Sequence, residues 1–299
     1  MMKKILVTGI TGFLGKNILE VYDKNEFEIV GVSRGCQVID GIRCIQADLL
    51  EIRDVEKIIE MEKPDILLLL AWDVSPNIYW QSYNNHLWAN SSIQLSEIFL
   101  RHGGKKIVFA GTSASYDYQY GYLTENLTPE KPSSLYGEAK LYTSHVLQSL
   151  ADQYNARYVE ARLFSIYGKY EHPNRLITKT IEILLDDGIV KNSKWNLYRD
   201  YIYVKDAANA IMLLIQNNCT SGVYNVSSGT PVSIREILET IEKQLVCTNK
   251  IEFVTPDTFG ECKLIVGNNN RMKALGFQCK YDIWNGINES IKYYRESQS

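Results

Sequence analysis

The chain of 299 residues lacks the features of several protein classes. Its longest strongly apolar stretch, Ile66 to Trp72, is far shorter than the ~20 residues that a membrane-spanning helix needs. Lysine and arginine never cluster beyond a pair, so no basic surface for nucleic acid is expected. The apolar run at the N-terminus is broken by Thr8-Gly9 before it reaches the length of an export signal. We therefore expect a cytoplasmic protein that binds neither membranes nor nucleic acids.

Cysteine and histidine are sparse and scattered. The six cysteines include no C-x-x-C pair, and the four histidines are equally dispersed. This pattern is typical of free thiols in a reducing compartment, and it predicts no metal site. With 45% hydrophobic residues, 22% charged residues and a net charge of −3, the chain has an ordinary globular composition. Its length suits one large α/β domain or a domain with a smaller lobe.

Short apolar or β-branched runs alternate with segments of helical period in the first third of the chain. This alternation is typical of βαβ units and a parallel sheet. The expected strands are Lys4–Thr8, Glu28–Ser33, Arg43–Gln46, Asp65–Ala71 and Lys105–Ala110, and the expected helices are Phe13–Asp23, Leu50–Glu60 and Trp80–Arg101. Residues 66–70 and 107–109 are apolar on both faces, which indicates a sheet covered by helices on both sides.

The rest of the chain contains the same kinds of element with less regular alternation. We expect helices at 135–151, 176–186, 206–216 and 234–246, and strands at 158–163 and 201–204. The strict alternation fades after Tyr167, so we place a soft domain boundary there.

A glycine loop joins the first expected strand to the first expected helix. Gly9 and Gly12 let the turn tighten and let backbone amides approach a pyrophosphate at the helix N-terminus, while Gly15 lets the helix pack closely on the strand. A strand before the loop and a helix after it distinguish it from a chance glycine pattern. The sequence therefore predicts a dinucleotide site formed by Gly9, Thr11, Gly12, Phe13, Leu14 and Gly15.

The ends of the second and third strands bear on which dinucleotide binds. Where an NAD site usually has an acid for the ribose 2′-hydroxyl, the chain has Ser33-Arg34. A hydroxyl beside a guanidinium suits a 2′-phosphate, so NADP(H) is favoured and NAD(H) is the alternative. A solvated loop arginine is the less favoured explanation of Arg34. Asp48-Leu49 are placed to meet the adenine, although an N-cap for the helix expected from Leu50 also explains Asp48.

Tyr136 and Lys140 lie four residues apart in an expected helix and therefore share one face. An ammonium beside a phenol favours the phenolate and makes Tyr136 a usable acid or base near neutral pH. In a chain with 20 tyrosines, a chance surface pair is the alternative. Thr112, Ser113 and Ser115 follow the fifth strand at the carboxyl edge, where open α/β sheets bind ligands, and offer hydroxyls to a substrate oxygen.

In this order, these motifs resemble the extended short-chain dehydrogenase/reductases, in particular their nucleotide-sugar epimerase, dehydratase and reductase branch. Three later segments match as well: Arg162 to Gly168, Arg199 to Asp206, and Tyr224 to Gly229, the last as a turn. The resemblance covers essentially the whole chain and implies an α/β fold with a Rossmann-type doubly wound parallel sheet. Residues 1–168 would bind NAD(P) and carry the catalytic groups. Residues 169–299 would form a smaller, mainly nucleotide-sugar-binding lobe, with about 195–218 packing back on the Rossmann core.

The resemblance also implies residue roles. Thr112 would hydrogen-bond the reacting sugar oxygen, Tyr136 would exchange a proton with that oxygen, and Lys140 would hold the nicotinamide ribose. Ala71 and Trp72 would border the cofactor. The residues on the substrate side would be Ser113, Ser165, Arg199, Tyr201 and Lys263, with Arg199 on the diphosphate.

Several positions depart from the family pattern. Ser165 stands where the family has an asparagine, and Trp88 stands where a cofactor-facing asparagine is common. Lys263 or Arg175 would have to replace a late arginine that clamps the diphosphate. Ser113-Ala114 stand where the 4,6-dehydratases carry Asp-Glu, which disfavours dehydration.

The remaining motifs serve a ketoreductase and a 4-epimerase equally. Because Ser33-Arg34 favour NADPH drawn from solution, we expect a 4-ketoreductase that makes a deoxy-sugar nucleotide in carbohydrate biosynthesis. A nucleotide-sugar 4-epimerase is the first alternative, and a non-catalytic dinucleotide sensor is a distant one. Relatives commonly pair through a four-helix bundle that contains the tyrosine helix, so a homodimer is expected, with the Trp80–Arg101 helix also able to take part. Leu135, Leu141 and Val146 are suitably spaced for the seam, although burial within the chain explains them equally.

Overall fold

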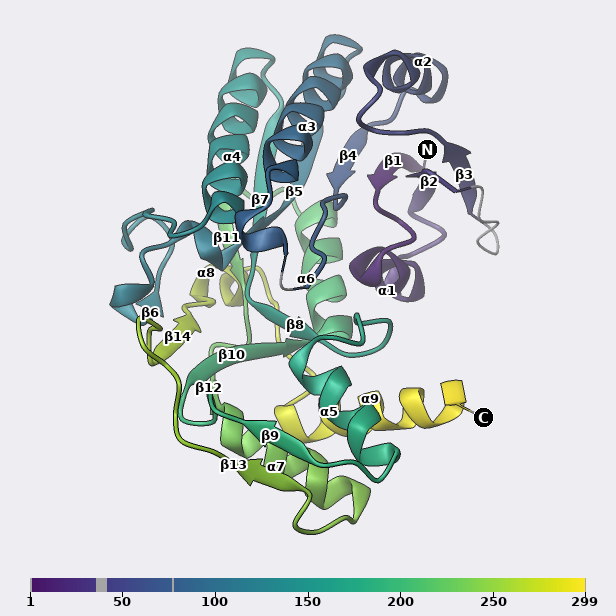
Figure 1. Ribbon diagram of the computed structural model, residues 1–299. Helices are drawn as coiled ribbons and strands as arrows, with labels where there is room; N and C mark the ends of the chain where they lie inside the picture. The colour runs from purple at the N-terminus through teal and green to yellow at the C-terminus, as the bar shows by residue number, and fades with distance from the viewer. Residues whose placement is uncertain (1, 36–41, 77, 299) are drawn as a thin grey trace. The chain divides into compact units, whose positions relative to one another are not determined.

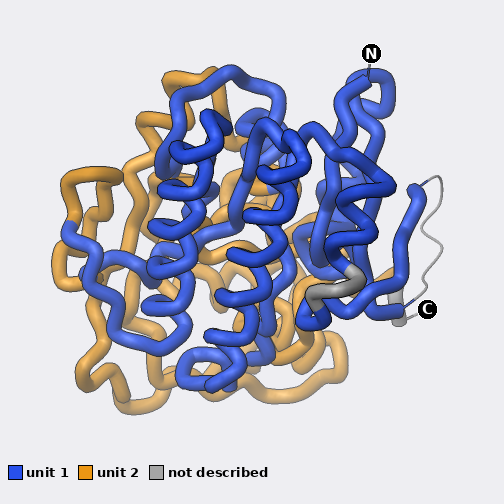
Figure 2. Tube along the Cα trace, turned by 90° about the horizontal axis from the view of Figure 1, so that it is seen from above, with its two compact units in different colours: residues 1–117, 129–162, 208–224 blue, residues 118–128, 163–207, 225–299 orange. Residues whose placement is uncertain are grey.

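The computed structural model describes residues 2–35, 42–76 and 78–298, and its chain divides into two compact units (Figure 2). Unit 1 comprises residues 1–117, 129–162 and 208–224, and unit 2 comprises residues 118–128, 163–207 and 225–299. Both units are therefore discontinuous in sequence. The assignment of cofactor and catalysis to residues 1–168 and of the nucleotide sugar to residues 169–299 stays a prediction.

Unit 1 is built around a seven-stranded sheet with the order β11-β7-β5-β4-β1-β2-β3 (Figure 1). Its strands are β1 (Lys3–Thr8), β2 (Phe27–Ser33), β3 (Arg43–Gln46), β4 (Ile66–Leu69), β5 (Lys106–Thr112), β7 (Arg157–Leu163) and β11 (Gly222–Val226). β1 pairs in parallel with both β2 and β4, so the strand order reverses at β1. Ligands of open α/β sheets bind outside the carboxyl ends of the strands at such a point. This arrangement confirms the predicted α/β class.

Helices cover the sheet. α2 (Ile52–Glu62), α3 (Asn84–Arg101) and α4 (Leu135–Gln153) pack Ile59, Phe99 and Leu147 into one apolar core with residues of the sheet such as Leu67. α3 and α4 lie side by side in this layer (Figure 1). α1 (Phe13–Val21) and α6 (Val204–Gln216) complete the helices associated with this sheet. β4 and β5 are buried along their whole length, as their continuous apolar sequences predicted.

The helix expected from Trp80 begins later than predicted. Residues Tyr79–Gln81 form a 3₁₀ turn, and α3 starts at Asn84. The Nδ2 of Asn85 donates to the carbonyl oxygens of Tyr79 (2.7 Å) and Ser82 (2.8 Å). Because this side chain holds the carbonyl oxygens of the preceding turn, the α-helix does not extend back through them.

Two strand ends were also predicted wrongly. The strand expected to reach Ala71 ends at Leu69, because the Thr8 Oγ1 accepts the N–H groups of Leu70 (3.1 Å) and Ala71 (3.2 Å). β5 extends to Thr112, two residues beyond the predicted end, so the Thr112 side chain starts from the last position of a strand.

Unit 2 contains two smaller sheets. The larger has the order β12-β10-β14-β6 with β8 paired to β10, and the smaller pairs β13 with β9. The strands are β6 (Tyr122–Leu123), β8 (Ser165–Tyr167), β9 (Val190–Asn192), β10 (Tyr198–Tyr203), β12 (Pro231–Ser233), β13 (Ile251–Phe253) and β14 (Leu264–Gly267). The helices are α5 (Leu176–Leu185), α7 (Ile234–Leu245), α8 (Asn270–Ala274) and α9 (Ile283–Gln298).

Several short elements differ from the sequence expectation. Tyr224 to Val226, expected in a turn, lie in β11, and β10 begins three residues before the predicted Tyr201. Strands of two or three residues such as β6 and β8 are too short to show a period in the sequence. No helix among the described residues is long and apolar enough to cross a membrane.

Candidate functional site

The glycine loop has the geometry of a phosphate cradle. Gly9 adopts a φ of +70°, and a Cβ on it would lie 2.8 Å from the backbone N of Ala71. A Cβ on Gly15 would lie 2.4 Å from the carbonyl oxygen of Ile10. α1 starts with Gly12 as its N-cap, where no side chain caps the helix. Backbone N–H groups and the positive end of the helix dipole can therefore face an anion, so the loop fits the pyrophosphate of a dinucleotide.

The residues after β2 form a tight turn. Ser33 Oγ donates to the carbonyl oxygen of Gly35 (2.6 Å), and Gln46 donates to the carbonyl oxygen of Arg34 (3.1 Å). The Arg34 side chain is exposed. The pKa of Asp73 is lowered, chiefly by its hydrogen bond with Ser75 and to a smaller extent by the charge of Arg34. The backbone around Arg34 is thus held while its guanidinium stays accessible to a ligand.

Asp48 does not cap α2. Its Oδ1 accepts the N–H of Leu50 (3.0 Å) within a turn, whereas the N-cap of α2 is Glu51. The helix-cap explanation of Asp48 was therefore wrong. Leu49 is buried, and the placement of Asp48 and Leu49 against adenine stays a prediction.

α4 packs very closely against the turn Ser113–Ser115, which follows Thr112 at the end of β5. A Cβ on Gly137 would lie 2.5 Å from the carbonyl oxygen of Ala114, so only glycine permits the approach. Ser134 caps α4 by accepting the N–H of Gly137 (3.1 Å). Thr112 Oγ1 accepts the N–H of Ala114 (3.2 Å), which uses an oxygen lone pair and leaves the hydroxyl proton for donation to a substrate oxygen.

Lys140 is almost completely buried beside Tyr136. Its Nζ donates to the carbonyl oxygen of Ala110 (2.8 Å) and lies 3.9 Å from the Trp72 ring centroid and 4.7 Å from that of Phe109. Burial lowers the pKa of Lys140 to about 7, against a smaller opposing effect of Glu160. With this pKa, the Lys140 side chain is only partly protonated near neutral pH.

Three aromatic side chains surround the Tyr136 ring edge-on. The ring centroids of Trp72, Tyr79 and Trp80 lie 6.4, 4.8 and 5.7 Å from that of Tyr136. Sequence reasoning named Trp72 but missed Tyr79 and Trp80. The available signal was the spacing of Trp72 and Trp80, which lie eight residues apart in a chain that has only five tryptophans.

In unit 1, the buried charges of Arg162 and Glu160 form a cluster with the partly exposed Glu130. Arg162 pairs with Glu160 and Glu130 at 2.8 Å each, and Ser144 donates to Glu160 (2.5 Å). A Cβ on Gly111 would lie 2.0 Å from Glu160, so β5 fits closely over this carboxylate. Arg162, the first residue of the matched segment, therefore has a structural role in unit 1.

In unit 2, Arg199 is already engaged. Its guanidinium donates to the carbonyl oxygens of Tyr198 (2.8 Å) and Cys262 (3.0 Å) and lies 3.4 Å from the Glu261 carboxylate. A diphosphate would have to compete with Glu261 for this group. The Lys263 side chain is exposed to solvent. Burial raises the pKa of the Tyr201 phenol well above its usual range.

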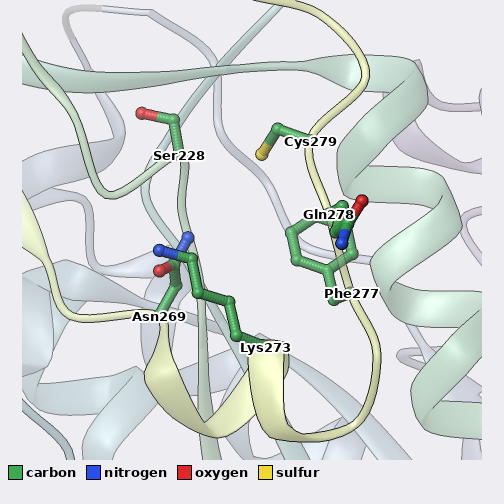
Figure 3. A pocket seen from close by; sticks show the side chains of 6 residues that line it. All are labelled: Ser228, Asn269, Lys273, Phe277, Gln278 and Cys279. Atoms are coloured by element: carbon green, nitrogen blue, oxygen red, sulfur yellow. The ribbon is translucent and has the colours of Figure 1, made fainter.

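Asp200, beside Arg199, organises a turn in unit 2. Its carboxylate accepts the N–H groups of Ser228 (2.7 Å), Gly229 (3.0 Å) and Gly267 (3.1 Å). Ser228 also lines a cavity of about 470 Å³ together with Asn269, Lys273, Phe277, Gln278 and Cys279 (Figure 3). None of the predicted substrate residues lines this cavity.

The structure thus groups Thr112, Tyr136, Lys140, Trp72 and the glycine loop within unit 1, where Ser113 also lies. Ser165, Arg199, Tyr201 and Lys263 belong to unit 2. Among the described residues, Glu56, Glu60 and His102 place possible metal-ligand atoms within 4.8 Å of one another. All three are exposed, and Glu56 lies 3.9 Å from Arg101, so they form no built metal centre.

Comparison with known proteins identifies the family to which this chain belongs. The model of the family described as NAD dependent epimerase/dehydratase matches residues 5–227, about three quarters of the chain. The chain belongs to this family. Membership makes it an enzyme of the NAD-dependent epimerase/dehydratase type, and it confirms the family that the motifs predicted.

Relatives of the epimerase/dehydratase family resemble the chain along its whole length. The mouse dTDP-D-glucose 4,6-dehydratase is 20% identical over 99% of this chain and 89% of its own. A Thermus thermophilus UDP-glucose 4-epimerase, solved with NAD, has a TM-score of 0.86 at 23% identity and covers 98% of this chain and 99% of its own. A Methanobrevibacter ruminantium UDP-N-acetylglucosamine 4-epimerase has a TM-score of 0.87 at 22% identity, with 99% of both chains covered. The predicted Rossmann-type fold is confirmed.

Proposed function

We propose that this enzyme is an NAD(P)-dependent oxidoreductase that acts at C4 of a nucleotide-activated sugar. The observation that carries the proposal is the close approach of α4 to the end of β5, which groups Tyr136 and Lys140 with the strand that ends at Thr112. Thr112 donates a hydrogen bond to the reacting sugar oxygen, and Tyr136 exchanges a proton with it. Lys140 holds the nicotinamide ribose, and the dinucleotide, when bound, supplies or accepts the hydride.

We further propose that the reaction is reduction of a 4-keto sugar to a deoxy-sugar nucleotide. Ser33 and the exposed Arg34 support NADP(H), because a guanidinium can bind a 2′-phosphate in place of the usual acid. Ser113 and Ala114 offer no carboxyl for the elimination of water, which argues against a 4,6-dehydratase. Ser113, Ser165, Arg199, Tyr201 and Lys263 are proposed to contact the nucleotide sugar.

A nucleotide-sugar 4-epimerase with NAD is the second candidate. The similar Thermus thermophilus structure is a UDP-glucose 4-epimerase complex with NAD, and an epimerase needs the same phenol and hydroxyl. We propose a cytoplasmic homodimer for either reaction.

The test is turnover by the purified protein with a panel of nucleotide sugars. The ketoreductase should oxidise NADPH with a 4-keto-6-deoxy nucleotide sugar, and mass spectrometry should identify the reduced product. Interconversion of C4 epimers with NAD, and no oxidation of NADPH with any keto sugar, would favour the epimerase instead. Identifying any dinucleotide that copurifies supplies an independent check of NADP(H) against NAD(H).

A further inference from the structure

Asn85 joins two separate segments beside the proposed site. It is 1% exposed in the first turn of α3. Its Oδ1 accepts the indole N–H of Trp72 (2.9 Å), and its Nδ2 donates to the carbonyl oxygens of Tyr79 (2.7 Å) and Ser82 (2.8 Å). Both amide protons and an oxygen lone pair are therefore used, which few other side chains could reproduce.

Both segments contact the groups proposed to react. The Tyr79 ring meets Tyr136 edge-on at 4.8 Å with an interplanar angle of 88°. The Trp72 ring meets Tyr136 at 6.4 Å and 82°, and its centroid lies 3.9 Å from Lys140 Nζ. A rotation of the indole would move a ring that touches both the phenol and the ammonium.

We propose that Asn85 is a positioning residue, which fixes Trp72 and the Tyr79–Gln81 turn so that Tyr136 and Lys140 keep their orientation and their exclusion from water. It touches neither Tyr136 nor Lys140 through a hydrogen bond of its own and acts through the aromatic rings. The expected effect on turnover rests on the proposed function, whereas the expected effect on the pKa of Lys140 rests on the geometry of unit 1 alone.

The environment of Lys140 makes the proposal measurable. The groups around it are the carboxylate of Glu160 on β7, the phenol of Tyr136 on α4, the carbonyl of Ala110 on β5, and the rings of Trp72 and Phe109. Burial is the main reason that the pKa of Lys140 is lowered, and Trp72 is the nearest ring. If Asn85 releases the indole, water reaches the ammonium and the titration midpoint of Lys140 moves upward.

The test is a pH titration of the protein labelled with ¹⁵N-tryptophan, followed by NMR. The Trp72 indole signal, identified by its loss in Trp72→Phe, should titrate near pH 7 in the unaltered protein. In Asn85→Ala we expect this midpoint to rise by about one unit or more. In the control Asn90→Ala, an exposed position on the same helix, it should not move. An unchanged midpoint in Asn85→Ala overturns the proposal.

Turnover supplies a second readout. Asn85→Ala should lower kcat and shift its pH profile upward, with little change in the KM for the nucleotide sugar. If Asn85→Ala does not fold, Trp72→Phe removes the indole N–H that Asn85 holds, so the ring over Lys140 loses its anchor and the kcat profile should shift the same way. An unshifted profile there overturns the proposal. The NMR titration needs no substrate. Failure of the unaltered protein to turn over any nucleotide sugar would therefore contradict the proposed function, and the NMR titration would still test the role of Asn85.

Discussion

The surroundings of Tyr136 suit it to proton exchange. Aromatic edges enclose its ring, and a buried lysine with a pKa of about 7 lies one helical turn away. A phenol in such a setting can exchange a proton with a bound alcohol or ketone, because the neighbouring amine gains and loses its own proton near physiological pH.

Replacing Tyr136 with phenylalanine should sharply reduce turnover while leaving dinucleotide binding intact. The ring and its packing remain, and only the proton donor is lost, so we expect kcat to fall by about 10²–10⁴-fold. Steady-state kinetics and a fluorescence titration with NADPH measure the two effects separately. Tyr142→Phe, at an exposed position of the same helix, is the control. An unchanged kcat in Tyr136→Phe would contradict the proposed role of Tyr136 in proton exchange.

Arg34→Ala tests the preference for NADP(H). Because the lost interaction is a charge-assisted hydrogen bond to the 2′-phosphate, NADPH affinity should fall by about 10-fold or more while NADH affinity stays nearly constant. Isothermal titration with each dinucleotide gives the ratio. An equal loss for NADH and NADPH would show that Arg34 does not read the phosphate.

Among the elements, α4 owes its close packing to Gly137, which has no side chain. Gly137→Ala would place a methyl group 2.5 Å from the Ala114 carbonyl oxygen and 2.8 Å from Pro132 Cβ. α4 must then move away from the end of β5, so we expect a loss of about 1–3 kcal/mol in the free energy of unfolding and a larger relative loss of kcat. Urea unfolding and kinetics test this. Ser149→Ala, exposed near the other end of α4, should change neither.

β5 and α6 are tied by a buried lysine. Lys106 Nζ donates to the carbonyl oxygens of Leu214 (2.5 Å), Ile215 (2.9 Å) and Asn217 (2.8 Å). Burial lowers the pKa of Lys106 to about 8 from its usual 10.5. Between these values the unfolded chain binds more protons than the folded one at this site, so the contribution of Lys106 to stability increases as the pH rises.

The unaltered protein should therefore gain stability relative to Lys106→Met as the pH rises. We expect the difference between their free energies of unfolding to increase by about 1–3 kcal/mol between pH 7 and pH 10. Urea unfolding at both pH values measures the difference. The exposed neighbour Lys105 supplies the control, since Lys105→Met should show a difference that is flat with pH. A flat difference for Lys106→Met as well would contradict the lowered pKa.

At the scale of the whole molecule, a homodimer is expected through α3 and α4. Leu87, Leu135 and Tyr142 are exposed on these helices by 43%, 44% and 58%. Leu141, expected on the same seam, is buried inside the unit and cannot take part. Sedimentation equilibrium at micromolar concentration should give twice the chain mass of 34.3 kDa. A stable monomer would rule this pairing out.

Patterns local in sequence predicted most of unit 1. The glycine loop, the buried strands β4 and β5, and the pairing of Tyr136 with Lys140 follow from spacing along one strand or one helix, where backbone geometry fixes which side chains share a face. The short strands of unit 2 escaped prediction because two or three residues show no period. The start of α3 escaped because one asparagine side chain holds the carbonyl oxygens of the turn before it.

The sequence by itself determined the α/β class, the glycine loop between β1 and α1, and the residue types available for proton transfer, since each depends on local propensity and spacing. Only the tertiary structure decided the environment of those residues. Trp72 lies over Lys140, three rings enclose Tyr136, and Glu261 lies against Arg199. Burial and contacts between distant segments control protonation and charge, and no spacing along the chain encodes them.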